Sequence, residues 1–408
     1  MSPSPNIRGP GQVEGTIAPG FEPVWDAFEH NCRDLGDGGG GFAAFADGQQ
    51  IVDLYAGEAR PGVRWGPQTL GVLFSATKGL TTICAQILAD RGELDIDQPV
   101  AAYWPDFARH GKETVKVRHV LSHTAGVLEL PGYQNLLTWN GAGFDHYEEI
   151  SRRLEDARLC WTPGTRQGYH AATFGWILAK LIQIITGQTL GAFFAEVVAQ
   201  PLSVELRIGT PQRCHSRVPI FSDKSSRPSD PDRAKIWDIW HDPETLSGKS
   251  FLAMRDGNGF DHMSQLMNNP RILAAEIGTA NATGSARDLA RLYALLACGG
   301  KLGTHRLLSQ ERVLEWAKEQ ASGIDTVSLM PWRWALGYHL QSPALTANGR
   351  WPGPFGPNLE SAFGHVGHGG QVGGADPERH VAVAFLRNQL IDSFRLPSML
   401  VQALYQCL

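Results

Sequence analysis

The chain has 408 residues, 42% hydrophobic and 19% charged, which is enough apolar material for a large core and two structural lobes. The formal net charge is -5 and no basic run or tail occurs, so the composition argues against a nucleic-acid or polybasic membrane surface. The first residues lack the pattern of a secretory signal, and the six cysteines form no C-x-x-C pair, so we expect free thiols and a cytoplasmic protein.

The N-terminal part predicts a helix followed by a hairpin. Residues 21–35 place apolar side chains on one side of a helix, and the glycine run 38–41 is expected to break the chain after it. Two apolar segments, 42–45 and 50–55, flank an Asp-Gly pair, which is typical of a hairpin turn.

Ser75 and Lys78 stand where an apolar segment turns into a long apolar helix. Residues three apart share a helix face, so the hydroxyl and the amine can meet. At a helix N-terminus, free N–H groups and the helix dipole would stabilise negative charge near Ser75. Burial between two apolar runs would lower the pKa of Lys78 towards values that suit a base. The pair therefore suits a serine nucleophile activated by lysine, although the motif alone also fits a helix cap followed by a surface lysine.

Helical patterns dominate from residue 75 to about residue 300. The apolar stretch 174–198 contains polar residues and predicts a buried helix pair rather than a membrane span. Strand-like runs return at 334–340 and 380–386, and a closing helix is expected over 393–406.

Strands at both ends with helices between them predict an α/β (α+β) fold with an antiparallel sheet flanked by helices. We expect a discontinuous sheet domain from residues 1–70 and 285–408, and an inserted, mainly helical domain from residues 71–284, with the active site between them. Within the insert, residues 221–269 are polar and rich in proline and aspartate. This segment is expected to be an irregular surface excursion and a candidate lid.

Three motifs in order carry a family resemblance. Ser75-Ala76-Thr77-Lys78 is followed by D-R-G-E-L-D-I-D-Q-P-V at 90–100 and by V-R-H-V-L-S-H-T-A-G at 117–126. This set resembles the serine β-lactamase and penicillin-binding-protein superfamily, within it the class C-like branch with family VIII carboxylesterases and DD-peptidases. The likeness runs from about residue 42 to residue 388. It implies a β-lactamase/transpeptidase-like fold, an acyl-enzyme on Ser75, Lys78 as the base, and no metal or organic cofactor.

The family's second element is a tyrosine in Y-x-N, and two tyrosines compete for it. Tyr133-Gln134-Asn135 matches literally, whereas the motif at Tyr169 has Ala171 in place of asparagine. We choose Tyr169 because it follows a W-T-P-G-T turn that precedes this tyrosine in the family. Tyr133 is interpreted as a surface or rim residue. The resemblance makes Tyr169 a proton relay, and the missing asparagine counts against β-lactam or peptide turnover.

The third element is His365-Val366-Gly367, which resembles the K-T-G strand in its H-x-G form and implies a substrate-binding role. By the same resemblance, the backbone N–H groups of His368 and Ser75 form the oxyanion hole. Val366 replaces a hydroxyl residue that helps bind the carboxylate of penicillins, and the K-T-G lysine is absent. This motif therefore favours neutral esters.

We thus predict a carboxylesterase acting on small short-chain esters, with no nucleic-acid or membrane partner. A β-lactamase or DD-peptidase is the nearest alternative, and a penicillin sensor or scaffold and acyl transfer to an alcohol stay open. The pairs His365–His368 and His119–His123 have metal-compatible spacing without an obvious third ligand, so no metal is expected. Oligomeric state, acyl length and alcohol preference are not determined by the sequence.

Overall fold

A large antiparallel sheet organises the protein. The computed structural model describes residues 13–138, 140–224, 226–253, 263–342, 353–358, 360–391 and 393–408. In this part of the chain, ten strands form one sheet in the order β1-β3-β2-β15-β14-β13-β12-β11-β10, with β4 paired to β3. The strands are β1 (Val13–Ile17), β2 (Gly39–Ala46), β3 (Gln49–Arg60), β4 (Val63–Arg64), β10 (Ala321–Ile324), β11 (Pro331–Trp334), β12 (His339–Leu340), β13 (Phe363–Gly367), β14 (Gln371–Asp376) and β15 (Val381–Arg387).

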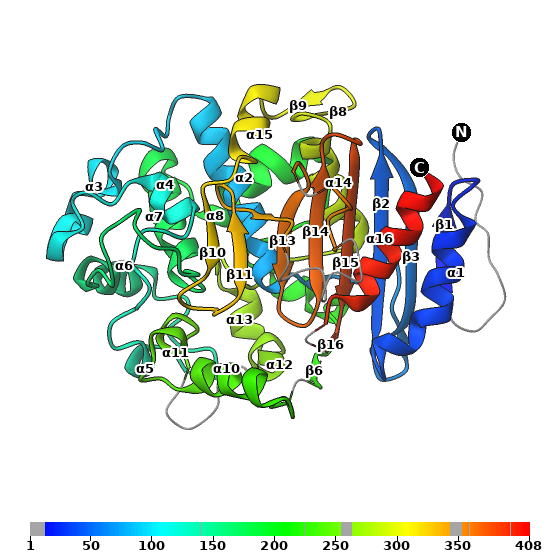
Figure 1. Ribbon diagram of the computed structural model, residues 1–408, viewed down its shortest axis with the longest axis horizontal. Helices are drawn as coiled ribbons and strands as arrows, with labels where there is room; N and C mark the ends of the chain where they lie inside the picture. The colour runs from blue at the N-terminus through cyan, green and yellow to red at the C-terminus, as the bar shows by residue number, and fades with distance from the viewer. Residues whose placement is uncertain are drawn as a thin grey trace.

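The two ends of the chain meet in this sheet. Strand β2 pairs antiparallel with β15, which brings Phe42 opposite Phe385 and Ala44 opposite Val383. In Figure 1 the blue N-terminal strands lie beside the orange-red C-terminal strands. The predicted α+β class with an antiparallel sheet flanked by helices is confirmed.

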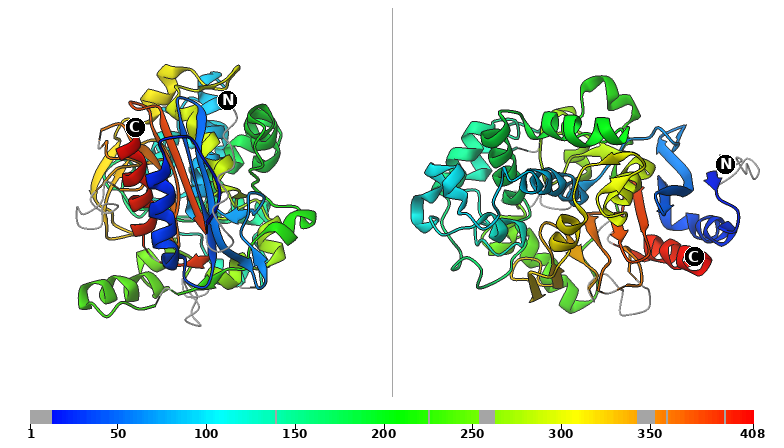
Figure 2. Two further views of the ribbon diagram at one scale, coloured as in Figure 1. Left: turned by 90° about the vertical axis from the view of Figure 1, so that its right-hand side faces the viewer. Right: turned by 90° about the horizontal axis from the view of Figure 1, so that it is seen from above.

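Helices cover both faces of the sheet. On one face, α1 (Glu22–Asn31) and α16 (Arg395–Cys407) lie side by side (Figure 2, left) and bury Trp25, Phe28 and Leu400 against the strands. On the other face, α14 (Ala286–Ala297) packs on β2, β14 and β15. Each helix presents one apolar face to the sheet, which is what a layered α+β fold requires.

Most of the remaining helices gather at the far end of the sheet from α1 and α16 (Figure 1). Helix α2 (Thr77–Asp90) runs through this part, and every residue from Thr77 to Ala89 is buried. The others are α3 (Val100–Tyr103), α4 (Val117–Leu121), α5 (Tyr133–Leu136), α6 (Tyr147–Asp156), α7 (Thr173–Thr186), α8 (Leu190–Phe194), α9 (Gln200–Leu202), α10 (Pro231–His241), α11 (Leu246–Ser250), α12 (Met263–Met267), α13 (Pro270–Ala274) and α15 (Gln310–Trp316).

The apolar stretch 174–198 folds as the predicted helix pair. Helix α7 and the stretch Leu190–Leu202 are bent by 72° at the break between them. Among the described residues, no single helix is long and apolar enough to cross a membrane, and only this bent pair passes a test of length and composition.

Three local expectations are wrong. The glycine run does not end at a break, because Gly39 to Gly41 belong to β2. Residues 334–340 form two strands joined by a turn at Gly337 instead of one strand. The segment 221–269 is more regular than its composition predicts, since α10, α11 and α12 lie in it. Asp230 and Thr245 cap the first two of these helices and Pro231 begins α10, so residues typical of loops here mark helix starts.

Close packing explains the glycines in β2. A Cβ on Gly39 would lie 2.8 Å from the Ala56 carbonyl oxygen and 2.9 Å from the Glu58 nitrogen. These atoms belong to the backbone of the neighbouring strand and cannot move aside.

We therefore expect Gly39→Ala to lower the free energy of unfolding by about 1–3 kcal/mol, the usual cost of overpacking. Thermal or urea unfolding measures it. Gly66→Ala is the matched control, because a Cβ there meets nothing within 4 Å. An unchanged stability of the Gly39 variant would contradict the packing argument.

Candidate active site

Ser75 lies in a short, strained turn at the entrance to α2. It is the middle residue of a 3₁₀ turn, Phe74–Ala76, so the α-helix proper begins two residues later than predicted, at Thr77. Phe74 has φ of 47°, a left-handed conformation that costs a non-glycine residue roughly 1–2 kcal/mol. Such strain persists where the surroundings over-determine the backbone, and here it presents Ser75 at a cavity wall.

A two-stranded sheet holds the segment before Ser75. Strand β5 (Gly71–Val72) pairs with β7 (Thr283–Gly284), and the Leu73 N–H donates to the Ala282 carbonyl over 2.8 Å. The Ala282 N–H in turn donates to the Thr77 hydroxyl over 3.0 Å. These contacts attach the start of α2 to residues about 205 positions later in the chain.

Lys78 is fully buried on the first turn of α2. Its amine donates to the Tyr169 hydroxyl over 2.7 Å and to the Thr279 carbonyl over 3.4 Å. Burial lowers the pKa of the amine well below its ordinary value of 10.5. A neutral amine can accept a proton, so this environment supplies a base.

Tyr169 lies between Ser75 and Lys78. Its phenol accepts from the Lys78 amine, and the Ser75 side chain is near enough to lower the pKa of the phenol by hydrogen bonding. Burial raises the pKa of the phenol, the Ser75 hydrogen bond lowers it, and the Asp325 carboxylate raises it again. Ser75 and Lys78 therefore both lie beside Tyr169, the third predicted catalytic residue. Its raised pKa keeps the phenol protonated.

The competing tyrosine lies elsewhere. Tyr133 is 3% exposed, and its hydroxyl donates to the Ala253 carbonyl. The interpretation of Tyr133 as a surface or rim residue is wrong, because α5 packs it into the core. It does not line the cavity that contains Ser75.

The H-x-G strand lies against the turn that carries Ser75. A Cβ on Gly367 would meet the Leu73 carbonyl at 2.4 Å, so only glycine allows this approach. His368, in the turn after β13, lines the cavity with Ser75. His365, Val366 and Gly367 are buried and are not among the cavity-lining residues, so their substrate-binding role stays a prediction.

An apolar cavity opens beside Ser75, with a volume of about 120 Å³. Its polar lining is limited to a few hydroxyls and His368, and its walls come mainly from apolar residues. These are Phe74, Phe144, Ala171, Ala172, Trp176, Phe251, Leu252, Met263, Leu266, Met267, Ile277 and Ala280.

Ser250 stands beside Ala171, the position where the family pattern has asparagine. Its hydroxyl donates to the Tyr169 carbonyl over 2.7 Å and accepts from the Ala171 N–H over 3.3 Å. Its only proton is donated to the protein backbone, so Ser250 offers a substrate no hydrogen-bond donor in place of the missing amide N–H.

Sequence reasoning missed four residues that surround Tyr169. Thr279 accepts from Lys78, Ser250 and Asp325 bond the Tyr169 backbone, and the Trp334 ring stacks on the phenol at 5.5 Å and 6°. No local signal marks them, since they lie 81 to 201 positions from their partners.

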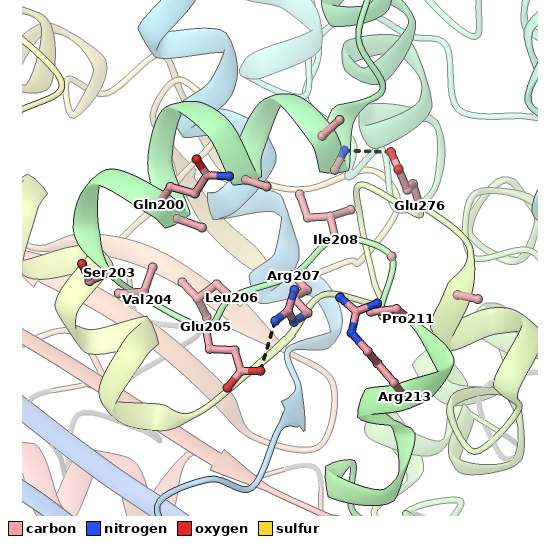
Figure 3. A pocket seen from close by; sticks show the side chains of 16 residues that line it. Gln200, Ser203, Val204, Glu205, Leu206, Arg207, Ile208, Pro211, Arg213 and Glu276 are labelled. Atoms are coloured by element: carbon pink, nitrogen blue, oxygen red, sulfur yellow. Dashed lines mark hydrogen bonds and ion pairs between the residues drawn. The ribbon is translucent and has the colours of Figure 1, made fainter.

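A second cavity, of about 730 Å³, lies between the α8–α9 stretch and residues 203–213 (Figure 3). On its wall, Arg207 donates to the Glu205 carboxylate, and the Glu276 carboxylate accepts the Gly191 N–H. None of the predicted site residues lines it. Within the described ranges, no group of three or more His, Cys, Asp or Glu side chains is arranged to hold a metal ion.

Comparison with known proteins shows the family. The family model Beta-lactamase matches residues 28–404. The chain belongs to the beta-lactamase family. Its relative "Esterase/beta-lactamase LipL" of Mycobacterium tuberculosis is 34% identical over 395 residues, covering 93% of this chain and 84% of LipL.

Solved structures of this family superpose over nearly the whole chain. A family VIII carboxylesterase gives a TM-score of 0.82 at 30% identity, covering 97% of this chain and 100% of that one. A penicillin-binding protein homolog from Caulobacter crescentus gives 0.82 at 29% identity, covering 98% and 100%. The predicted superfamily is confirmed, and the protein is an enzyme of the serine hydrolase superfamily.

Replacing the buried amine should separate activity from stability. We expect Lys78→Met to lower hydrolytic activity by about 10²- to 10⁴-fold, because the candidate base is lost. In the unfolded chain the Lys78 amine is protonated below its ordinary pKa of 10.5. In the folded protein its pKa is lower, so the amine is protonated only at a lower pH. Between these values the wild type loses stability as the pH falls, and the Met variant does not.

Thermal unfolding from about pH 10 down to about pH 7 checks this: the Tm advantage of the Met variant should grow as the pH falls. Lys318→Met, at an exposed position, should change neither property. A Tm difference that is independent of pH would contradict a buried neutral amine.

Proposed function

We propose that the protein hydrolyses short-chain carboxylic esters through an acyl-enzyme on Ser75. One observation carries the proposal: a buried amine donates to a phenol that lies beside Ser75 at the wall of an apolar cavity. A nucleophile with an adjacent base in such a setting is the arrangement that acyl transfer needs.

The protons follow the hydrogen bonds. The Ser75 proton passes to the Tyr169–Lys78 pair as the hydroxyl oxygen attacks the ester carbonyl. Tyr169 then returns a proton to the departing alcohol, and Lys78 replaces it through the 2.7 Å hydrogen bond. In the second half, water takes the place of the alcohol and the same pair activates it, which releases the acid.

The negative charge of the tetrahedral intermediate needs donors. We assign them to the backbone N–H groups of Ser75 and His368, because both residues line the same cavity. One such donor is typically worth about 3 kcal/mol of barrier.

Several features favour an ester over a β-lactam or a D-Ala-D-Ala peptide. Ala171 and Val366 provide no polar group where the family pattern has asparagine and a hydroxyl residue. The cavity is small and largely apolar, which suits a short acyl chain. Relatives named as esterases support the same choice, while the double name of LipL keeps β-lactam hydrolysis as the second candidate.

The catalytic assignment is tested with a p-nitrophenyl acyl ester. We expect Ser75→Ala and Tyr169→Phe each to abolish hydrolysis, because one removes the nucleophile and the other the relay. Tyr133→Phe is the matched control and should keep the wild-type rate, since neither Tyr133 nor its partner Ala253 lines the cavity. Full activity of Ser75→Ala would refute the proposal.

Substrate preference is tested at Ala171. We expect the wild type to hydrolyse p-nitrophenyl butyrate with a higher kcat/KM than nitrocefin. Ala171→Asn places an amide in the apolar wall and should lower kcat/KM for the ester while raising the nitrocefin-to-ester ratio. A wild type that prefers nitrocefin would reverse the order of the two candidate functions.

A further inference from the structure

Tyr169 has no regular secondary structure to hold it. It lies in the extended segment before α7, outside every strand ladder and helix. Its position depends on three separate contacts. The Ser250 hydroxyl donates to its carbonyl, the Trp334 ring stacks on its phenol ring, and its N–H donates to a carboxylate. A relay phenol must stay within hydrogen-bond reach of two partners, so these contacts matter for chemistry.

The carboxylate belongs to Asp325, which is fully buried. One of its oxygens, Oδ1, accepts the Tyr169 N–H over 3.1 Å. The same oxygen accepts the N–H groups of Val327 and Ser328 over 3.0 and 2.7 Å, and the Ser328 hydroxyl over 3.0 Å. Hydrogen bonds to an ionised oxygen are roughly twice as strong as neutral ones.

The loop that presents Asp325 is itself closed. The Asp325 N–H donates to the Met330 carbonyl, and the Leu329 N–H donates back to the Asp325 carbonyl, each over 2.9 Å. The Thr326 N–H donates to the Gln167 carbonyl over 3.0 Å, two residues before Tyr169. The loop and the relay segment are therefore joined at two points.

We propose that Asp325 is a positioning residue for the relay: it holds the backbone of Tyr169 so that its phenol reaches Ser75, Lys78 and the leaving alcohol. This inference rests on the proposed function and names a residue that the family motifs do not contain. The Asp325 carboxylate also helps to raise the pKa of the phenol, after burial and against the Ser75 hydrogen bond, which keeps the relay proton available.

If Asp325 positions the phenol, its loss should affect esters with different leaving groups unequally. General destabilisation of the fold would affect them equally. An alkoxide such as ethoxide is a poor leaving group and needs a proton from Tyr169, whereas p-nitrophenolate departs without one. A displaced phenol should therefore slow acylation by an ethyl ester far more than acylation by a p-nitrophenyl ester.

The experiment compares kcat/KM for ethyl butyrate and p-nitrophenyl butyrate in the wild type, Asp325→Ala and Asp376→Ala. We expect Asp325→Ala to lower the value for the ethyl ester at least about tenfold more than the value for the p-nitrophenyl ester. Asp376 is the matched control: it is fully buried and accepts the N–H groups of Glu378 and Arg379 in the turn after β14. Its removal should affect both esters equally.

Folding is checked by thermal unfolding of each variant. If Asp325→Ala does not fold, Asp325→Asn decides, because its amide oxygen still accepts the Tyr169 N–H without the charge. We expect a shift of the ester ratio in the same direction, by about threefold. Equal losses on the two esters, or a wild-type ratio in the Asn variant, would overturn the inference while leaving the proposed function intact. A wild type that hydrolyses neither ester would overturn both.

Discussion

The proposed chemistry depends on an amine that is removed from water without a carboxylate to compensate its charge. Within the described contacts, the Lys78 amine donates only to the Tyr169 phenol and the Thr279 carbonyl. A carboxylate partner would favour the charged form and raise the pKa, which would remove the base. Burial without such a partner lowers the pKa of the amine. The fold must therefore enclose Lys78 completely and still leave Ser75 accessible.

Helix α2 meets both demands. Its first turn places Lys78 in the core, while the strained turn before it brings Ser75 to the cavity wall. The stability lost through a buried amine and a left-handed Phe74 is recovered elsewhere, since α2 buries all its residues except the last. Functional sites commonly hold such local strain, supported by the packing around them.

Four distant segments complete the site around this helix. They are the extended segment with Tyr169, the loop with Asp325, the turn after β13 with His368, and Thr279 beside α2. Because they come from both the sheet and the helical part, the relay geometry depends on how these parts pack together. The cavity wall near Ala171 is mainly apolar, and the Ser250 hydroxyl beside it is bonded to the backbone.

The sequence by itself determined the elements whose signals are local. The amphipathic helix at 21–35, the hairpin at 42–55 and the helix after Ser75 follow from hydrophobic periodicity and turn residues. The motif order also identified the family and led to the choice of Tyr169 over Tyr133.

Only the tertiary structure decided the rest, because the deciding contacts join residues far apart in the chain. Neighbouring backbone leaves no room for a Cβ on Gly39 in β2, and loop-like residues in 221–269 cap helices α10 and α11. The hydrogen bond from the Tyr169 N–H to Asp325 joins residues 156 positions apart, and no local sequence pattern indicates it. Periodicity reports what one segment tends to form, whereas a site is made by the distances between segments.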